Sequence, residues 1–568
     1  MKKFLGTILV AMLLSGAFAQ TMNVAWPYKL PPEGHFNSLA KSAMNLGIYI
    51  DLMQPPIALY HWADGSYEGI AAESFGFDAD GNYVVKLKSG HNWSDGSPIT
   101  ADDLLTTFNA KYITGATVWN NLEDVVKVDD MTAKFILGEP SVATERLILV
   151  ENLRPTSVYG GFASKVAELR GMGMDKDSDE MKAVLTELTE FRPVDYVSGG
   201  PFVMDTESIT DASLKLLKNE GGIGSDTTAF NDVTIWNGET ETVFPLVVDG
   251  QLWYATHGFA PAQEEAQIAA GLDIIRNPYY SGPALYFNQT NPLFANPVFR
   301  QAVAYAIDRD ENGFVSLGES GRAVELMTGV SDNLIGAYVD EATLDSLNTY
   351  DYDLDKAAEL MTSLGYAKGS DGIWANADGK LSFEMIFPAE YADWSAAAEN
   401  AAQALNDFGI EITAKGVQFQ QQRQDVYDGN FEIAIRNWGV GSPFPYRAYL
   451  QPYDRYNGQG ELAGEGAGGG MHYDPNITYS GGDVNVYDLA VEAGKGSDLD
   501  KIKSLVTQLA VSFNETLPIV PLWERFGNNP LNRTYVDAPE GSDPIFLNSG
   551  SDHFMPYMII TGKVKPAQ

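Results

Sequence analysis

Apolar and polar residues alternate from Tyr83 to Leu87, a pattern typical of a half-buried strand. Ser94-Asp95-Gly96 follows and predicts a tight turn. A helix is predicted next, capped by Thr100, with Asp102 and Asp103 near its positive end. Its apolar face comprises Ala101, Leu104, Leu105, Phe108 and Tyr112. Nothing in this unit of strand, turn and helix forms a catalytic arrangement.

Similar patterns recur in the second half of the chain. Leu285 to Phe287 is typical of a buried strand, and Asn296-Pro297 then opens a helix with a cap followed by a first-turn proline. A further helix is predicted from about Leu354 to Leu364, with Asp353 as its cap and Gly365 at its end. Strands and helices therefore mix throughout. A chain of 568 residues is too long for one ordinary core, so we expect two or more α/β domains.

The first 20 residues have the composition of a secretory signal peptide. Lys2 and Lys3 form a short basic region, residues 4–16 are apolar, and Ala17-Phe18-Ala19 is an A-x-A cleavage site before Gln20. An uncleaved anchor is the alternative, but the apolar run is shorter than the roughly 20 residues that cross a bilayer. We expect residues 1–19 to be removed and the mature protein to be exported.

Charge and cysteine content exclude several classes of partner and site. The chain carries 37 basic and 76 acidic residues, a formal net charge of −39, and loss of Lys2 and Lys3 makes it −41. A field of this sign repels nucleic acid and anionic lipid, and no basic run compensates for it. The absence of cysteine excludes disulfides, thiolate metal sites and a cysteine-linked lipid at the cleavage site. We therefore expect a protein free in a periplasm, or secreted.

A search for reactive groups is mostly negative. Nucleophile-elbow, zinc-protease and phosphate-loop motifs are absent, and the six histidines are scattered without ligand-like spacing. Gly464-x-Gly466-x-x-Gly469 matches a dinucleotide fingerprint in letters, but no strand precedes it and no helix follows it. We expect no catalytic residue, no metal site and no cofactor. Two carboxylates at glycosidase distance remain an open alternative among so many acidic residues.

Five segments resemble, in order, the family-5 solute-binding proteins of bacterial ABC importers, a group whose members bind oligopeptides, dipeptides, nickel or oligosaccharides. The first is the unit from Gly90 to Tyr112 described above. The others are residues 125–135, residues 198–202, residues 286–288 together with 299–309, and residues 517–523. Each segment alone is only moderately specific, but the resemblance covers most of the chain after residue 20.

This resemblance implies an architecture and a way of working. The fold would be a two-lobed α/β periplasmic-binding-protein fold of the cluster C type, with an extra subdomain in a large first lobe. The first lobe would comprise residues 20–280 and 517–568, and the second lobe residues 281–516. The protein would be a monomer without enzymatic activity. It would capture a small oligomeric solute in the cleft between hinged lobes and pass it to the membrane permease of an ABC importer.

The main candidate binding segment lies in the predicted second lobe. Residues 431–435 alternate as a strand, and Asn437-Trp438 lies where that strand should emerge into a loop rich in glycine and proline. This arrangement resembles the family's strand-to-loop segment that supplies ligand contacts. Peptide-binding members often read Trp-x-x-Asp here, and the aspartate pairs with the ligand's α-ammonium group. The candidates are Asn437, Trp438, Gly439, Gly441, Ser442 and Tyr446.

The position of that aspartate is Gly441 in this chain, so a peptide N-terminus is poorly served unless another acid, such as Asp425 or Asp428, reaches the site. A tryptophan with Asn and Ser neighbours suits a neutral, hydroxyl-rich ligand, although Trp438 could instead be a core residue. The sequence favours an oligosaccharide over an oligopeptide or a metal chelate. A secreted hydrolase that uses paired carboxylates is the alternative from another class.

Weaker candidates for ligand contact match family regions that approach the cleft. They are Trp26, near the mature start, and Trp253 with His257, in the block before the predicted crossing at residue 280.

Overall fold

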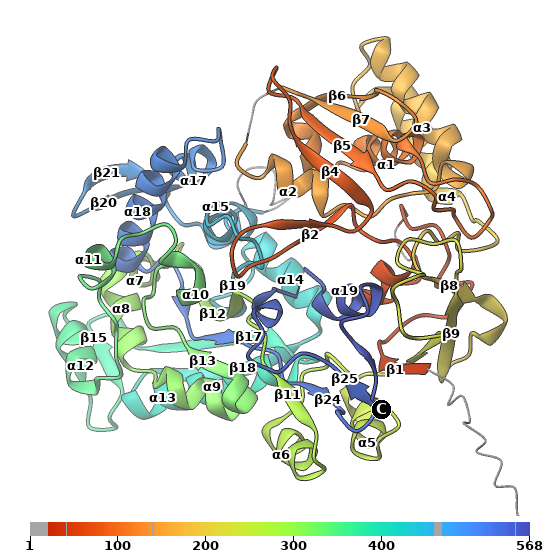
Figure 1. Cartoon of the computed structure of the whole chain (residues 1–568). Coiled ribbons are helices and arrows are strands. Elements are labelled where there is room, and N and C mark those ends of the chain that lie inside the picture. The colour runs from red at the N-terminus through yellow and green to blue at the C-terminus, as the bar shows by residue number, and fades with distance from the viewer. Residues whose placement is uncertain (1–20, 41–42, 139–140, 459–467, 551, 568) are drawn as a thin grey trace, which may run out of the picture.

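The computed structural model describes residues 21–40, 43–138, 141–458, 468–550 and 552–567, and the predicted signal peptide lies outside these ranges. Its two largest hydrophobic cores divide the chain into two bodies (Figure 1). One core contains residues between Met22 and Ile275 and between Leu531 and Val564. The other contains residues between Ala284 and Trp523. We call these bodies the first and the second lobe, and the fold is the predicted two-lobed α/β fold.

Two four-stranded sheets and their helices build the first lobe. One sheet has the order β1-β10-β9-β8 and pairs β1 with β10 in parallel; the other, β4-β5-β7-β6, is antiparallel. The strands are β1 (Thr21–Ala25), β4 (Ala72–Phe77), β5 (Tyr83–Leu87), β6 (Leu122–Lys127), β7 (Thr132–Leu137), β8 (Phe202–Asp205), β9 (Ser213–Lys218) and β10 (Asp232–Trp236). The helices include α1 (Ala101–Ile113), α2 (Thr144–Leu149), α3 (Thr156–Gly171), α4 (Asp179–Glu190), α5 (Thr240–Val248), α6 (Pro261–Ala269) and α19 (Phe554–Ile560).

A five-stranded mixed sheet of order β18-β17-β19-β12-β22 forms the centre of the second lobe. The strands are β12 (Ser281–Phe287), β17 (Ser382–Pro388), β18 (Glu411–Val417), β19 (Ile433–Gly439) and β22 (Val520–Pro521). The helices of this lobe include α8 (Pro297–Tyr305), α9 (Arg309–Leu317), α12 (Leu354–Ser363), α13 (Ala392–Phe408), α14 (Phe419–Asp428), α15 (Tyr446–Leu450), α17 (Val486–Glu492) and α18 (Leu499–Thr516).

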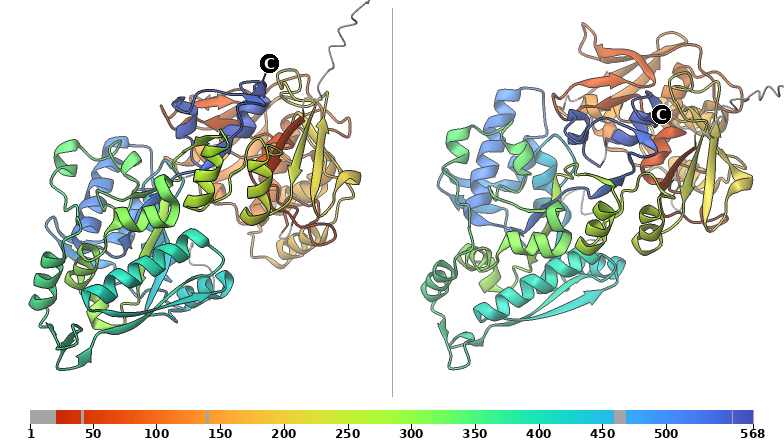
Figure 2. Two further views of the ribbon diagram at one scale, coloured as in Figure 1. Left: turned by 90° about the horizontal axis from the view of Figure 1, so that it is seen from below. Right: turned by 60° about the horizontal axis from the view of Figure 1, so that its bottom comes forward.

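The chain passes between the lobes twice. Strand β11 (Asp273–Ile275) pairs with β24 (Asn529–Leu531) in the first lobe, and β13 (Gly321–Ala323) pairs with β23 (Trp523–Arg525) in the second. Residues 276–280 and 526–528 therefore connect the two bodies, which Figure 2 shows beside one another. The Tyr280 ring in the first connection stacks on Trp62 of the first lobe, with ring centroids 3.9 Å apart.

Local predictions of helix starts are confirmed. The Thr100 side chain accepts a hydrogen bond from the Asp102 N–H, and the Asp103 carboxylate accepts one from the Thr100 N–H, which completes a capping box. Helix α8 begins after Asn296, whose side chain caps it, and Asp353 caps α12 in the same way. These caps satisfy backbone N–H groups that have no partner inside the helix.

One local prediction is wrong: the strand that begins near Ile433 does not end before Asn437. It continues through Trp438 to Gly439, because residues Ser281 to Pro283 of β12 pair with it in antiparallel register. Gly282 allows this pairing, since a Cβ there would lie 1.9 Å from the Trp523 carbonyl oxygen and 3.2 Å from the Trp438 indole nitrogen. Within the described ranges, no helix combines the length and apolarity that a membrane span requires.

Candidate functional site

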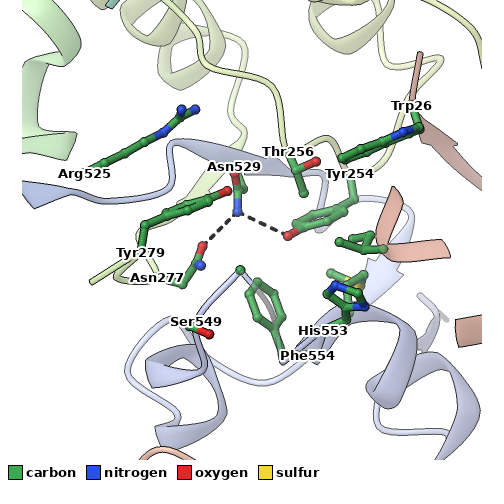
Figure 3. A pocket seen from close by; sticks show the side chains of 13 residues that line it. Trp26, Tyr254, Thr256, Asn277, Tyr279, Arg525, Asn529, Ser549, His553 and Phe554 are labelled. Atoms are coloured by element: carbon green, nitrogen blue, oxygen red, sulfur yellow. Dashed lines mark hydrogen bonds between the residues drawn. The ribbon is translucent and has the colours of Figure 1, made fainter. Parts of the chain in front are cut away.

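A cavity of about 260 Å³ lies where the two connecting segments meet the first lobe (Figure 3). Its walls come from the first lobe near the end of β1, from the connecting segments and the strand ends beside them, and from the start of α19 with the turn before it. The lining residues are Trp26, Ile48, Tyr254, Thr256, Asn277, Tyr279, Arg525, Asn529, Ser549, Gly550, His553, Phe554 and Met555. Aromatic rings and amides dominate this set, and none of these residues carries a carboxylate.

Packing and hydrogen bonds fix the aromatic walls. Gly47 lies under the Trp26 ring with a φ of 55°, and a Cβ there would come within 2.2 Å of a ring atom. The Asn529 side chain donates to the Tyr254 hydroxyl at 3.2 Å and to the Asn277 side-chain oxygen at 2.9 Å. Figure 3 shows these groups converging at the centre of the site. Rigid aromatic faces next to fixed amides can stack on a ligand and hydrogen-bond to its hydroxyls.

Two basic side chains, Arg525 and His553, reach the cavity. The Arg525 guanidinium lies over the Tyr279 ring, 5.1 Å from its centroid. His553 Nδ1 lies 2.7 Å from the Asp51 carboxylate. Burial alone would lower the pKa of His553, but the Asp51 carboxylate more than offsets it, so the pKa is raised.

Three buried polar atoms at this end of the cleft have no hydrogen-bond partner within the described residues. They are Thr256 Oγ1, Arg525 Nε and Asp393 Oδ2. Asp393 belongs to the first turn of α13 in the second lobe, and its Oδ2 lies 3.5 Å from Arg525 Nη1. A buried polar atom without a partner costs about 1–3 kcal/mol, and a ligand group that paired with these three atoms would remove that cost.

Of the residues predicted to contact ligand, Trp26 lines this cavity. Trp438 does not: its side chain is 0% exposed, and its indole N–H donates to the Trp523 carbonyl oxygen at 3.1 Å. The Asn437 side-chain oxygen accepts from the Tyr456 hydroxyl at 2.6 Å. Gly439 has a φ of 66°, and a Cβ there would lie 2.5 Å from the Tyr280 carbonyl oxygen. Tight backbone packing therefore accounts for this glycine.

The other predicted second-lobe residues lie after the strand ends. The Ser442 hydroxyl accepts from the Phe444 N–H at 3.3 Å, and the Tyr446 ring packs over Gly494. The carbonyl oxygen of Gly494 accepts a hydrogen bond from the Ser141 hydroxyl of the first lobe at 2.7 Å. The segment from Gly441 to Tyr446 thus lies close to a contact between the lobes, away from the cavity lining.

The segment around residue 254 was identified from the sequence, but its side chains divide between two faces. Trp253 stacks on Tyr535, with ring centroids 5.3 Å apart, while Tyr254 and Thr256 face the cavity. His257 Nε2 lies 2.9 Å from the Gly238 carbonyl oxygen, and burial lowers its pKa. Extended backbone points successive side chains to opposite faces, which explains why the neighbours of the predicted residues line the cavity.

Four cavity residues in or beside the connecting segments were not predicted from the sequence: Asn277, Tyr279, Arg525 and Asn529. One of these four could have been found from the family resemblance at residues 517–523. Arg525 lies two residues after Trp523 on the same extended strand, so its side chain lies on the same face as Trp523, near the predicted crossing between the lobes. For metals, no group of three candidate ligand side chains occurs among the residues that the structure describes. The glycine fingerprint at residues 464–469 lies largely outside those residues.

Comparison with known proteins identifies the family. The family model for bacterial extracellular solute-binding proteins, family 5, matches residues 66–460. A probable ABC transporter-binding protein of Deinococcus radiodurans is 25% identical in an alignment 516 residues long, which covers 82% of this chain and 80% of that protein.

Solved structures share the fold. A periplasmic oligopeptide-binding protein of an oligopeptide ABC transporter from Thermotoga maritima is 20% identical, with a TM-score of 0.76 over 96% of this chain and 99% of that one. A mannohexaose-bound structure of such a protein, also from Thermotoga maritima, is 21% identical, with a TM-score of 0.72 over 97% and 99%. The family model spans well over half of the sequence, and the segments that join the two lobes border the cavity. The chain therefore belongs to family 5 of the bacterial extracellular solute-binding proteins.

Proposed function

We propose that this protein captures an oligosaccharide between its two lobes and delivers it to the membrane permease of an ABC importer. The observation that carries the proposal is the cavity lining, in which Trp26, Tyr254 and Tyr279 surround the amides of Asn277 and Asn529 without any carboxylate. Sugar rings stack their C–H faces on aromatic rings, and their hydroxyls both donate to and accept from amides. The Asp393 carboxylate of the second lobe faces the Arg525 guanidinium at 3.5 Å, so a peptide ammonium group beside that carboxylate would also meet a positive charge.

The relatives are consistent with this choice of ligand. One of the similar Thermotoga maritima structures holds mannohexaose, so this fold accommodates an oligosaccharide. At the position where peptide-binding members often carry an aspartate, this chain has Gly441. An oligosaccharide fits this one similar structure and peptides fit others, so the preference for an oligosaccharide rests on the cavity lining.

The proposal includes the place and the manner of action. We take residues 1–19 to be a cleaved signal, so that a monomer without a lipid anchor acts in the periplasm. The second connection, at residues 526–528, lies beyond the boundary at 516/517 that the resemblance implied, and the two connections allow the lobes to close as a hinged pair around the solute. The ATPase of the importer supplies the energy, and the binding protein has no catalytic activity of its own.

A thermal-shift screen tests the ligand class. The purified mature protein is mixed with mannose- and glucose-based oligosaccharides of two to six units and, separately, with peptides of two to five residues. A ligand at about 100 times its Kd stabilises the native state by about 2.7 kcal/mol and raises Tm. Saccharides should raise Tm and peptides should not. Stabilisation by peptides alone contradicts the oligosaccharide proposal, and turnover of a stabilising ligand contradicts the role as a binding protein.

A further inference from the structure

The unpartnered atoms at the cleft come from three different parts of the molecule. Thr256 belongs to the first lobe, Arg525 to the strand that leads into the second connection, and Asp393 to helix α13 of the second lobe. Figure 3 shows Thr256 and Arg525 on the same side of the cavity, across from Phe554. A single bound group that satisfies all three atoms would therefore contact both lobes.

The two charged members of this set are close without being well paired. Asp393 Oδ2 and Arg525 Nη1 are 3.5 Å apart, beyond the usual length of a charge-assisted hydrogen bond. Their side chains are 13% and 29% exposed, respectively, so water screens them only partly. Asp393 is held in place, because its other carboxylate oxygen accepts a hydrogen bond from the Trp394 N–H at 3.0 Å.

The missing partners have complementary chemistry. The Arg525 guanidinium only donates hydrogen bonds, a carboxylate oxygen only accepts them, and the Thr256 hydroxyl does both. A ligand hydroxyl can accept from the guanidinium and donate to the carboxylate at the same time, and a neighbouring hydroxyl can pair with Thr256. A peptide ammonium group is a poorer match, because next to Asp393 it would lie beside the positive charge of Arg525.

We propose that Thr256, Arg525 and Asp393 form a hydroxyl-binding set. This set would hydrogen-bond to neighbouring hydroxyls of the bound saccharide and couple its binding to closure of the lobes. The inference rests on the proposed function and extends it. It assigns recognition of the ligand hydroxyls to Thr256, Arg525 and Asp393. The carboxylate that contacts the ligand is then Asp393, which lies far in the sequence from Gly441, the position where peptide-binding members often carry an aspartate. Because the set spans both lobes, the ligand completes it when the lobes are closed.

Three conservative variants test the set. Thr256→Val keeps the shape and removes the hydroxyl, Asp393→Asn keeps an acceptor oxygen and removes the charge, and Arg525→Lys keeps the charge and removes Nε–H. Affinity for the saccharide that most stabilises the native protein is measured by calorimetry. Each variant should bind it about tenfold more weakly or worse, while its unfolding profile shows that it remains folded.

Matched controls carry the same chemical changes outside the cavity. Asp273→Asn alters an acid that pairs with Arg533 at 2.8 Å, and Thr186→Val removes a hydroxyl that donates to the Lys182 carbonyl on helix α4. Both controls should keep the native affinity within about twofold. Monodeoxy derivatives of the same saccharide add a second test. The derivative that lacks the contacting hydroxyl should bind the native protein more weakly, but Asp393→Asn should bind it and the parent saccharide about equally.

The outcomes separate the two proposals. If the native protein binds saccharides while all three variants keep its affinity, the hydroxyl-binding set is wrong and the proposed function stands. The set is also wrong if the variants lose affinity but no deoxy derivative shows coupling with Asp393. If the native protein binds peptides and no saccharide, the proposed function fails and this inference fails with it.

Discussion

Trp438 is held by packing on one side and by a hydrogen bond to the Trp523 carbonyl oxygen on the other. Replacing it with alanine removes a fully buried indole and leaves a cavity next to Gly282. We predict that Trp438→Ala lowers the free energy of unfolding by about 3–5 kcal/mol, as measured by urea denaturation. A folded variant with native stability and at least tenfold weaker ligand binding would contradict this prediction and support direct contact with the ligand.

We predict that Glu524 makes the folded protein less stable as the pH rises, the opposite of the effect of a salt-bridged carboxylate. Burial is the main cause that raises its pKa from the usual 4.5 to about 7, and the neighbouring Asp332 adds to the effect. Burial likewise raises the pKa of Asp332 to about 6. The folded protein therefore holds protons that the unfolded chain releases near pH 4 to 5. Stability is fully present below that range and falls as the pH rises towards 7, by about 3 kcal/mol for Glu524.

Glu524→Gln isolates this effect, because the amide oxygen can still accept from Ser331 and Asn333 as the carboxylate does. We predict that the variant matches the native protein near pH 4.5 and is more stable than it at pH 8 by about 2–3 kcal/mol. Urea unfolding across this pH range measures both values. The exposed acid Glu359, changed to Gln, is the control. If the free energy of unfolding changes with pH equally in the native protein and in Glu524→Gln, then Glu524 is not the source of the pH dependence.

At the scale of single elements, alternation along the segment at residues 253–256 decides which side chains face the cavity. Tyr254 faces the cavity and accepts a hydrogen bond from Asn529, whereas Trp253 stacks on Tyr535 on the other face. We predict that Tyr254→Phe weakens saccharide binding about threefold to tenfold, because Asn529 loses one of its partners in the cavity wall. Trp253→Phe keeps an aromatic ring and should bind as the native protein does. Calorimetry measures the saccharide affinity of both variants. Weaker binding by Trp253→Phe than by Tyr254→Phe would contradict the inferred alternation of the side chains.

Elements whose signals are local in sequence could be predicted well. Thr100, Asn296 and Asp353 cap their helices as expected, because a cap depends only on residues within one turn. The length of β19 could not be predicted in the same way. Its last residues are strand because Ser281 to Pro283 pair with them, and that pairing joins positions about 150 residues apart.

The cavity residues also divide into those that could be located from the sequence and those that depend on distant contacts. Trp26 and the segment at residue 254 could be located from the resemblance to family regions that approach the cleft. Asp393 and Arg525 could not be paired from sequence, since they lie 132 positions apart and meet only when α13 packs near β23. Trp438 has the composition of a binding residue, but the close approach of Gly282 and Trp523 turns its ring into the core.

At the scale of the whole molecule, capture of a ligand between the lobes requires the lobes to move as hinged bodies. Residues 276–280 and 526–528 are the connections, and the Ser141 hydroxyl already touches Gly494 across the lobes. We predict that a stabilising saccharide lowers the radius of gyration in small-angle X-ray scattering, because the closed state makes more contacts with the ligand. Peptides that do not stabilise the protein serve as the control. An unchanged radius of gyration at saturation would contradict hinge closure.

We propose that an oligosaccharide binds in the cavity lined by Trp26 and Tyr279. The most direct measurement is a crystal structure of the mature protein grown with the saccharide that raises Tm most. We expect density for sugar rings against Trp26 and Tyr279, with hydroxyls on Thr256 and between Arg525 and Asp393. A saccharide bound elsewhere, or a peptide retained in this cavity from the host, would contradict it.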